Sequence, residues 1–355
     1  MAHVVSQIAS ASFPRIGSLA RTTVPMARQL PKLAQFALAR ATGRKFPLMV
    51  TMSLTDKCNF RCHYCDLPHM NRAEMSTADW HRAIDELADA GMMRVSIMGG
   101  EPLLRKDVGE LVDHLKARGV NVAMNTNGWY FRDRMDVVAK LDLVCITLDG
   151  PVEVNDAQRH AGAHDRVLDA IDLAQSRGVK VITMTVLTKG GLDTIDYVLG
   201  VAREKGIRAF FQIEHPSDGD TNKTIAPQIA DDGMITAIAQ HLLRRKEEGW
   251  PVGPSKTFLR ELAGRDSQGQ RRLTSCETCF ASRYFLSITP TGYVVPCPLT
   301  FRGKGRFNGR EVGFATAFER LVQPTDAGCS CNPTTELNYL LHFRPEAIFN
   351  ALELV

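Results

Sequence analysis

The sequence has no uninterrupted apolar run that approaches 18 residues, and this absence excludes a helix that spans a membrane. It has no internal repeat or low-complexity tract, and the lack of a Gly-X-Y period excludes collagen. Hydrophobic residues make up 44% and charged residues 23%, a composition typical of a packed globular protein and not of a disordered one. A length of 355 residues predicts two domains, or one large α/β barrel with an appendage.

Acidic side chains are missing from the start of the chain, where the first one is Asp56. The basic side chains that precede it are Arg15, Arg21, Arg28, Lys32, Arg40, Arg44 and Lys45. The net charge of +4 therefore belongs to this amino-terminal arm, because the rest of the chain holds slightly more acidic than basic residues. The main body thus gives no electrostatic sign of a nucleic-acid partner.

No secretory signal, with its apolar core and small-residue cleavage site, is present in the sequence. We therefore expect a reducing, cytoplasmic location, where clustered cysteines indicate metal or redox chemistry more often than disulfides. The nine cysteines are Cys58, Cys62, Cys65, Cys145, Cys276, Cys279, Cys297, Cys329 and Cys331. Eight of them fall into two groups, while Cys145 stands alone in an apolar run and is expected to be a small buried residue of a strand.

Short β-branched runs alternate with amphipathic stretches after Pro47. The expected strands are 48–54, 94–98, 120–124, 143–148, 179–187 and 209–213. The expected helices are 77–90, 107–118, 132–140, 166–177, 192–205 and 231–248. This alternation predicts an α/β fold with a parallel sheet, and six units fit a partial (β/α)6 TIM-like barrel better than a full one.

Three regions follow from this pattern. We expect a basic amphipathic arm over 1–46, the barrel core over 47–250 and a small cysteine-rich region over 251–355. Residues 249–270 are interpreted as a bridging segment, and the turn Pro290-Thr291-Gly292 predicts a hairpin behind it.

The first cysteine group, Cys58-x3-Cys62-x2-Cys65, directly follows the first expected strand. Three thiolates on one short loop can surround a single iron–sulfur cubane and leave its fourth iron open for a substrate. Structural zinc is the alternative, but zinc normally takes four ligands, and His63 is adjacent to Cys62 and would strain a tetrahedron. An odd number of thiols argues against disulfides.

This CxxxCxxC loop, with Tyr64 before its last cysteine, resembles the radical SAM superfamily. Further motifs agree in order with the ends of successive strands: Gly99-Gly100-Glu101-Pro102, Asn125-Thr126-Asn127-Gly128 and Thr147-Leu148-Asp149-Gly150-Pro151, with Arg159 after them. Each motif alone is an ordinary turn, but ligands in such sheets bind at the strands' carboxyl ends. The resemblance covers about 47–215, and 181–187 lacks the glycine-rich pattern that some relatives place near adenine.

The resemblance implies a [4Fe–4S] cluster on Cys58, Cys62 and Cys65 that binds S-adenosylmethionine (SAM). The residues that it places around SAM are Tyr64, Gly99, Gly100, Glu101, Pro102, Asn127, Thr147 and Arg159. Glu101 would accept from the SAM ammonium group, and Arg159 would pair with its carboxylate. The implied activity is reductive cleavage of SAM to a 5′-deoxyadenosyl radical, which needs an electron donor such as flavodoxin or ferredoxin.

The second cysteine group resembles the SPASM and twitch extensions of radical SAM enzymes, and its opening is similar to that of the molybdenum-cofactor cyclases. Its members are Cys276, Cys279, Cys297, Cys329 and Cys331. The resemblance implies one auxiliary [4Fe–4S] cluster held by four of these five, or by three with substrate on the open iron. A four-thiolate zinc site is the alternative.

The substrate is the least determined feature. The arm's mixture of basic and apolar residues favours a peripheral position at the inner membrane surface and a lipid or lipid-linked substrate, in a layout similar to radical SAM enzymes that modify hopanoids. A solvated cap on the barrel and a transit peptide are alternatives for the arm. Ribosomal peptides, and sugars or aminocyclitols, are the alternative substrates, and a zinc-binding scaffold is the non-enzymatic alternative. Gln212, Glu214 and His215 are the candidate catalytic residues, because they end the sixth strand.

Overall fold

Six parallel strands form the centre of the molecule. The computed structural model describes residues 26–70, 72–187, 192–213, 232–264, 279–298, 305–323 and 332–352. The strands are β1 (Met49–Ser53), β2 (Arg94–Met98), β3 (Asn121–Thr126), β4 (Leu143–Thr147), β5 (Lys180–Leu187) and β6 (Arg208–Ile213). Each pairs in parallel with the next along the chain, so the predicted α/β partial-barrel fold is confirmed.

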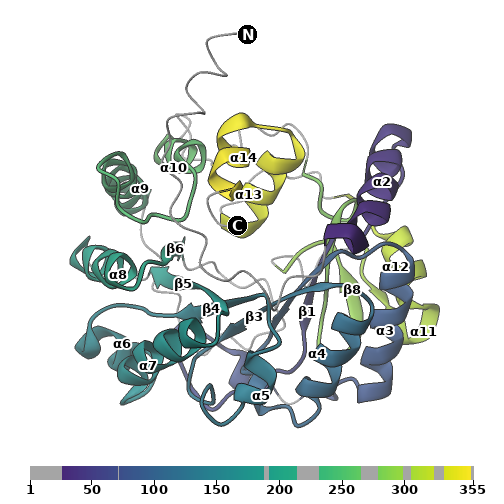
Figure 1. Ribbon diagram of the computed structural model, residues 1–355, viewed down its shortest axis with the longest axis horizontal. Coiled ribbons are helices and arrows are strands. Elements are labelled where there is room, and N and C mark those ends of the chain that lie inside the picture. The colour runs from purple at the N-terminus through teal and green to yellow at the C-terminus, as the bar shows by residue number, and fades with distance from the viewer. Residues whose placement is uncertain are drawn as a thin grey trace.

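Helices cover the outer side of this sheet (Figure 1). They are α3 (Thr77–Asp89), α4 (Val108–Ala117), α5 (Met135–Val138), α6 (Val152–Gln158), α7 (Ala163–Ser176) and α8 (Leu192–Lys205). Ser76 and Asp79 form a capping box at the start of α3. The helix buries Trp80 and Leu87, which lie on the same face because they are seven residues apart. The helix expected over 132–140 is wrong in length, because only the four residues of α5 are helical.

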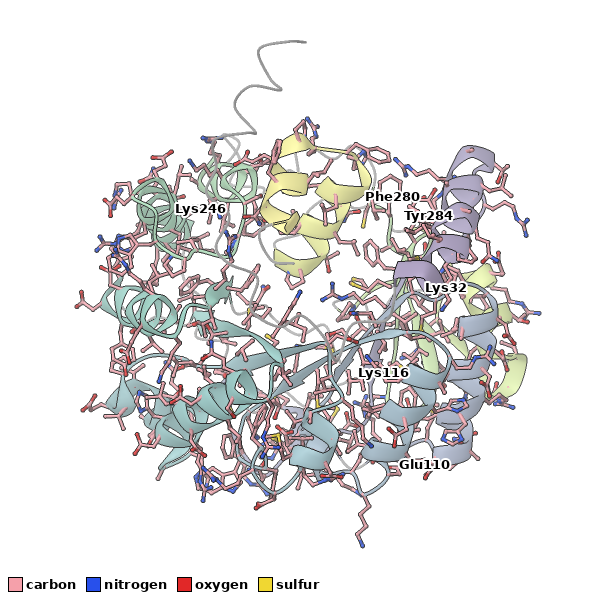
Figure 2. The ribbon with its side chains drawn as sticks, in the orientation of Figure 1. Lys32, Glu110, Lys116, Lys246, Phe280 and Tyr284 are labelled. Carbon is pink, nitrogen blue, oxygen red and sulfur yellow. The ribbon has the colours of Figure 1, made fainter. Side chains whose placement is uncertain are left out.

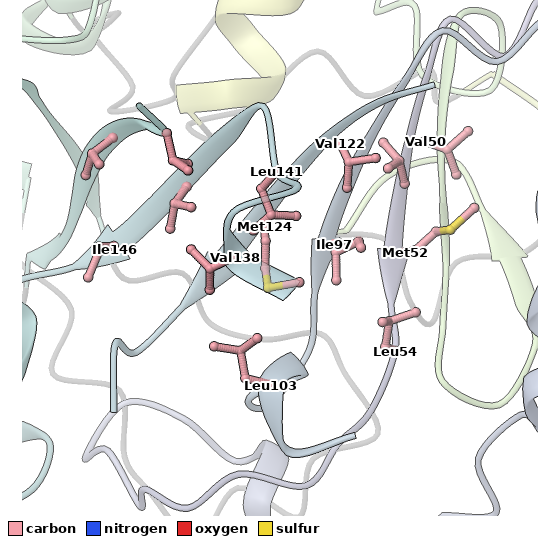
Figure 3. Packing of buried hydrophobic residues seen from close by; sticks show 14 of the residues in the cluster. Val50, Met52, Leu54, Ile97, Leu103, Val122, Met124, Val138, Leu141 and Ile146 are labelled. Atoms are coloured by element: carbon pink, nitrogen blue, oxygen red, sulfur yellow. The ribbon is translucent and has the colours of Figure 1, made fainter. Parts of the chain in front are cut away.

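The core lies between the helices and the outward faces of the strands. Val50 and Met52 of β1 pack there with Ile97, Val122 and Met124 of the next two strands (Figure 3). Alternate strand residues point to the opposite, inner face of the sheet. These include Cys145 of β4, which is buried as expected and does not belong to the outer core.

The carboxyl-terminal region continues the same sheet. Strand β7 (Phe285–Ile288) pairs in parallel with β1, and β8 (Tyr293–Val295) and β9 (Phe307–Asn308) follow in antiparallel order. The predicted hairpin is thus present as β7 and β8, but its addition to the edge of the barrel sheet was not expected. The division at residue 250 stays a prediction.

The remaining helices are α2 (Met26–Thr42), α9 (Asp232–Glu247), α10 (Lys256–Ala263), α11 (Gly309–Val312), α12 (Phe314–Arg320), α13 (Asn332–Leu341) and α14 (Pro345–Leu352), with the short turns η1 (Leu67–His69) and η2 (Pro102–Leu104). Helix α10 lies within 249–270, so part of the segment interpreted as a bridge is helical. Figure 1 shows α13 and α14 across from α3–α8, on the inner side of the sheet. Of the helices in the described ranges, none is long and apolar enough to cross a membrane.

Candidate active site

The loop after β1 brings the first three cysteines together. Cys58, Cys62 and Cys65 pack in one apolar cluster around Phe60 and Trp129, and all three are free thiols. Burial raises the pKa of Cys58 to about 11 and of Cys65 to about 12, and it also raises the pKa of Cys62. These thiols therefore keep their protons at neutral pH until a metal displaces them.

Two glycines at the end of β2 let the backbone approach this loop. The Gly100 amide donates to the carbonyl oxygen of Thr55 over 2.7 Å. A Cβ on Gly100 would lie 2.2 Å from the carbonyl oxygen of Lys57, and one on Gly99 would lie 2.3 Å from that of Thr55. Gly99 also has a φ of +143°, which favours glycine. The glycine pair therefore fixes the segment that leads into Cys58.

Glu101 ties the ends of β2 and β3 together. Its carboxylate is fully buried and accepts from the amides of Leu103 (3.0 Å) and Asn127 (2.8 Å) and from the hydroxyl of Thr126 (2.9 Å). Burial raises the pKa of Glu101, and these hydrogen bonds oppose that rise. Pro102 begins the turn η2 directly behind it. Both carboxylate oxygens thus already have partners within the chain, and the predicted contact of Glu101 with a SAM ammonium group stays a prediction.

Asn127 reaches from the end of β3 to the cysteine loop. Its side-chain amide donates to Asn59 Oδ1 over 2.9 Å and lies 3.8 Å from Cys58 Sγ, while its Oδ1 accepts from the Trp129 amide. The Phe60 amide is a second donor to Cys58 Sγ, at 3.4 Å. One sulfur thus faces two N–H groups, an arrangement that favours a thiolate over a thiol.

A buried triad joins the cysteine loop to β4. The Tyr64 hydroxyl donates to Asp149 Oδ2 over 2.6 Å, and Arg159 Nη1 donates both to that hydroxyl (2.6 Å) and to Asp149 Oδ2 (3.0 Å). Asp149 Oδ1 accepts from the Val186 amide of β5. Burial raises the pKa of Tyr64 well above its usual value, so the hydroxyl stays protonated. Arg159 Nε is buried without a hydrogen-bond partner, which leaves one donor for an anionic ligand.

Three rings pack together at the cysteine loop. Phe60 and His160 are stacked with centroids 5.1 Å apart, and Trp129 meets both edge-on. The sequence analysis missed this group and the role of Asp149. Asp149 was present in the motif that ends β4, whereas no periodicity signals the ring stack.

The predicted catalytic residues are only partly placed. Gln212 is half-buried in β6, where it pairs in register with Val186. Thr147, which is predicted to lie near SAM, is the half-buried last residue of β4. Glu214 and His215 lie outside the described residues. Their roles stay predictions.

The second cysteine group is described for two members. Cys297 is buried in an apolar cluster with Phe280 and Tyr284, and Cys279 packs against the same cluster. The other three, Cys276, Cys329 and Cys331, lie outside the described residues. Cys279 Sγ faces the N–H groups of Ala281 and Asn338, so its surroundings match those of Cys58.

The arrangement of the thiols fits iron–sulfur clusters. A cubane takes each thiolate on a different iron, so three thiolates of one loop suffice to hold it, whereas a structural zinc ion normally takes four ligands. The three free thiols of one loop, with N–H groups aimed at Cys58, have the donor chemistry that such a cluster requires.

Comparison with known proteins agrees with this geometry. The radical SAM superfamily matches residues 52–202. The mycofactocin maturase MftC of Mycobacterium ulcerans is 30% identical over 311 residues, which cover 81% of this chain and 80% of the relative. The PqqA peptide cyclase of Granulibacter bethesdensis is 26% identical over 263 residues, or 71% of this chain and 67% of the relative.

Among solved structures, Streptococcus suis SuiB bound to the precursor peptide SuiA has a TM-score of 0.65 at 17% identity, over 97% of this chain and 85% of SuiB. This likeness supports the fold. The match to the superfamily and the identity to MftC show that the chain belongs to the radical SAM superfamily and is an enzyme of the kind that carries an auxiliary-cluster extension after its core.

Proposed function

We propose that this enzyme modifies a peptide by hydrogen abstraction, as a maturase. The observation that carries the proposal is the 30% identity to a maturase over four fifths of that relative's length. The lipid substrate expected from the amino-terminal arm gains no support from such relatives, and the peptide alternative fits them better. Because the chain is an enzyme, a non-enzymatic zinc scaffold is no longer an alternative.

In this proposal Cys58, Cys62 and Cys65 hold the [4Fe–4S] cluster, which, when bound, supplies the electron that cleaves SAM to a 5′-deoxyadenosyl radical. The chain's own residues orient the cofactors. Gly99 and Gly100 fix the backbone in front of Cys58, and the orphan Arg159 Nε offers a donor to the SAM carboxylate.

The inner face of the sheet holds the substrate in this proposal. Met98, Asn125 and Thr147, at the carboxyl ends of three adjacent strands, are half-buried. Substrate bound against these side chains would be kept from water while the radical forms, which protects the radical from side reactions. Gln212 lies on β6, two strands from Thr147, and offers an amide to a peptide group.

An electron donor remains part of the proposal. Lys57, Arg61 and His63 are exposed on the cysteine loop itself. Basic side chains there favour an acidic carrier such as flavodoxin or ferredoxin, because opposite charges accelerate encounter.

The arm supports a second proposal, contact with an anionic membrane surface. Over residues 30–42 the only charged side chains are Lys32 and Arg40, and both face the protein. Lys32 donates to the carbonyl oxygen of Met92, and Arg40 lies over the rings of Phe280 and Tyr284, which Figure 2 shows beside α2.

The outward positions of α2 carry no charge: Gln35 and Thr42 are exposed, and so are the apolar residues Leu30, Leu33, Ala34, Ala37, Leu38 and Ala41. An uncharged outward face within an acid-free, basic segment is typical of helices that lie on lipid. This contact would position the enzyme without making lipid its substrate.

Deuterium transfer tests the proposed substrate class. The anaerobically reconstituted enzyme is incubated with SAM, a reductant and cell fractions grown on deuterated amino acids, and 5′-deoxyadenosine is analysed by mass spectrometry. We expect deuterium to enter 5′-deoxyadenosine from the peptide fraction. Deuterium that enters only from separately labelled lipid or sugar fractions would overturn the peptide proposal.

A further inference from the structure

Cys279 has two N–H groups directed at its sulfur. The amide of Ala281 lies 3.5 Å from Cys279 Sγ, and the side-chain amide of Asn338 lies 3.7 Å from it. Asn338 belongs to α13 and is fully buried, and the other hydrogen bonds of its side chain are made with backbone groups. Its Oδ1 accepts from the Phe280 amide over 2.8 Å, and its Nδ2 also donates to the Thr334 carbonyl oxygen.

Donors of the same two kinds, a backbone amide and an asparagine side-chain amide, are directed at the sulfur of Cys58 in the first cysteine loop. There the backbone donor is Phe60, two residues after the cysteine, at 3.4 Å, and the side-chain donor is Asn127, at 3.8 Å. Ala281 likewise follows Cys279 by two residues. Two segments that share no sequence motif thus present one sulfur with a backbone amide and an asparagine amide. A buried thiol needs no such pair, whereas a thiolate bound to iron accepts both.

We propose that Asn338 is a positioning residue for the auxiliary cluster, which acts through its hydrogen bond to the Cys279 sulfur and raises the cluster's reduction potential. The inference rests on the proposed role of Cys279 as a ligand of that cluster. A hydrogen bond to a ligand sulfur favours the reduced form, which carries one more negative charge, so its removal lowers the potential. Asn338 also joins helix α13 to the Phe280 backbone, so one side chain connects this helix to the cluster.

The test isolates the auxiliary cluster by replacing Cys58, Cys62 and Cys65 with alanine in the full chain. The reconstituted protein is analysed for iron and sulfide, and its cluster is titrated potentiometrically with detection by electron paramagnetic resonance. In this background Asn338→Leu removes the donor, and Asn338→Asp removes the donor but keeps an acceptor for the Phe280 amide. Gln323→Met is the matched control, because Gln323 donates to the carbonyl oxygen of Cys279 and not to its sulfur.

We expect both Asn338 variants to have a more negative midpoint potential than the parent, with the larger shift in Asn338→Asp because it adds a negative charge. The Gln323→Met midpoint should equal the parent's. Equal midpoints in all four proteins, or the same shift in Gln323→Met, would overturn the inference. A triple-alanine parent that binds no iron and sulfide would instead overturn the auxiliary cluster itself, so the two failures are distinguishable.

A measurement without any change at Asn338 covers the case in which its variants do not fold. The triple-alanine protein is made with ¹⁵N in its asparagine side chains, and pulsed electron paramagnetic resonance is recorded on the reduced cluster. We expect a ¹⁵N coupling that unlabelled protein lacks. Its absence from a loaded cluster would contradict the hydrogen bond.

Discussion

The hydroxyl of Tyr64 lies 2.6 Å from Asp149 Oδ2, and through this contact the cysteine loop is joined to the end of β4. Arg159 donates to both groups, so a residue of the loop completes an ion pair whose two members are almost entirely buried. A buried ion pair needs such additional hydrogen bonds to offset the cost of desolvation. Because Tyr64 is adjacent to Cys65, its hydrogen bonds to the Arg159–Asp149 pair also help to hold the backbone that carries the Cys65 thiol.

Tyr64→Phe should leave the Arg159–Asp149 pair in place but remove one buried hydroxyl from it. We expect the free energy of unfolding to fall by about 1–2 kcal/mol. Asp149→Asn should cost more, about 3–5 kcal/mol, because it leaves the Arg159 charge buried without its partner. Denaturant unfolding of the two variants measures both values. Equal losses, or a larger loss for Tyr64→Phe, would contradict the triad as described.

Gly100→Ala should disrupt the cysteine loop, because the added Cβ would lie 2.2 Å from a backbone oxygen. We expect a loss of stability of about 2 kcal/mol or more and a lower iron content after reconstitution. Gly200→Ala is the matched control, since Gly200 lies within α8 and nothing lies within 4 Å of its Cβ position. It should gain about 0.5–1 kcal/mol from helix propensity and keep its iron. Thermal unfolding and iron analysis of both variants check this contrast.

The sequence predicts the parallel strands well because each of them is a short run of β-branched and other apolar residues that can be recognised locally. The run 94–98 is bounded as expected, and the other five parallel strands differ by one or two residues at one or both ends. Helix α6 was missed because it has seven residues and buries only Asn155, so it has no apolar period to detect. The pairing of β7 with β1 joins segments more than 230 residues apart, and local periodicity carries no information about such a contact.

The candidate site shows the same division between local and tertiary information. The motif residues at the strand ends could be selected from the sequence because ligands bind at that edge of a parallel sheet. The sequence does not indicate which opposite charge each buried charged residue contacts. Arg159 pairs with the buried Asp149, a contact that neither motif indicates by itself, and its pairing with a SAM carboxylate stays a prediction.

Cys62→Ala and Cys145→Ala should separate cluster chemistry from simple burial. Cys145 faces the inner side of β4 beside Asn125 and Ile182, and burial raises its pKa to about 12, so it stays a neutral thiol. We expect Cys62→Ala to abolish 5′-deoxyadenosine formation in reconstituted enzyme with SAM and reductant. Cys145→Ala should keep most of the rate. Loss of activity in Cys145→Ala with full iron content would show that the inner thiol takes part in the reaction.

Leu33→Glu should weaken binding to anionic vesicles by about tenfold or more, because it places a negative charge in the uncharged outward face of α2, and burial of one leucine is worth about 1.5–3 kcal/mol. Leu33 is 42% exposed, so the substitution leaves the protein-facing contacts of Lys32 and Phe36 in place. Val152→Glu is the control, since Val152 is 41% exposed and begins α6, which lies on the opposite side of the molecule from α2 (Figure 1). Vesicle co-sedimentation with and without anionic lipid gives the measurement. A wild-type chain that fails to sediment, or an equal loss in Val152→Glu, would show that the outward face of α2 does not bind lipid, because in either case Leu33 makes no specific contribution.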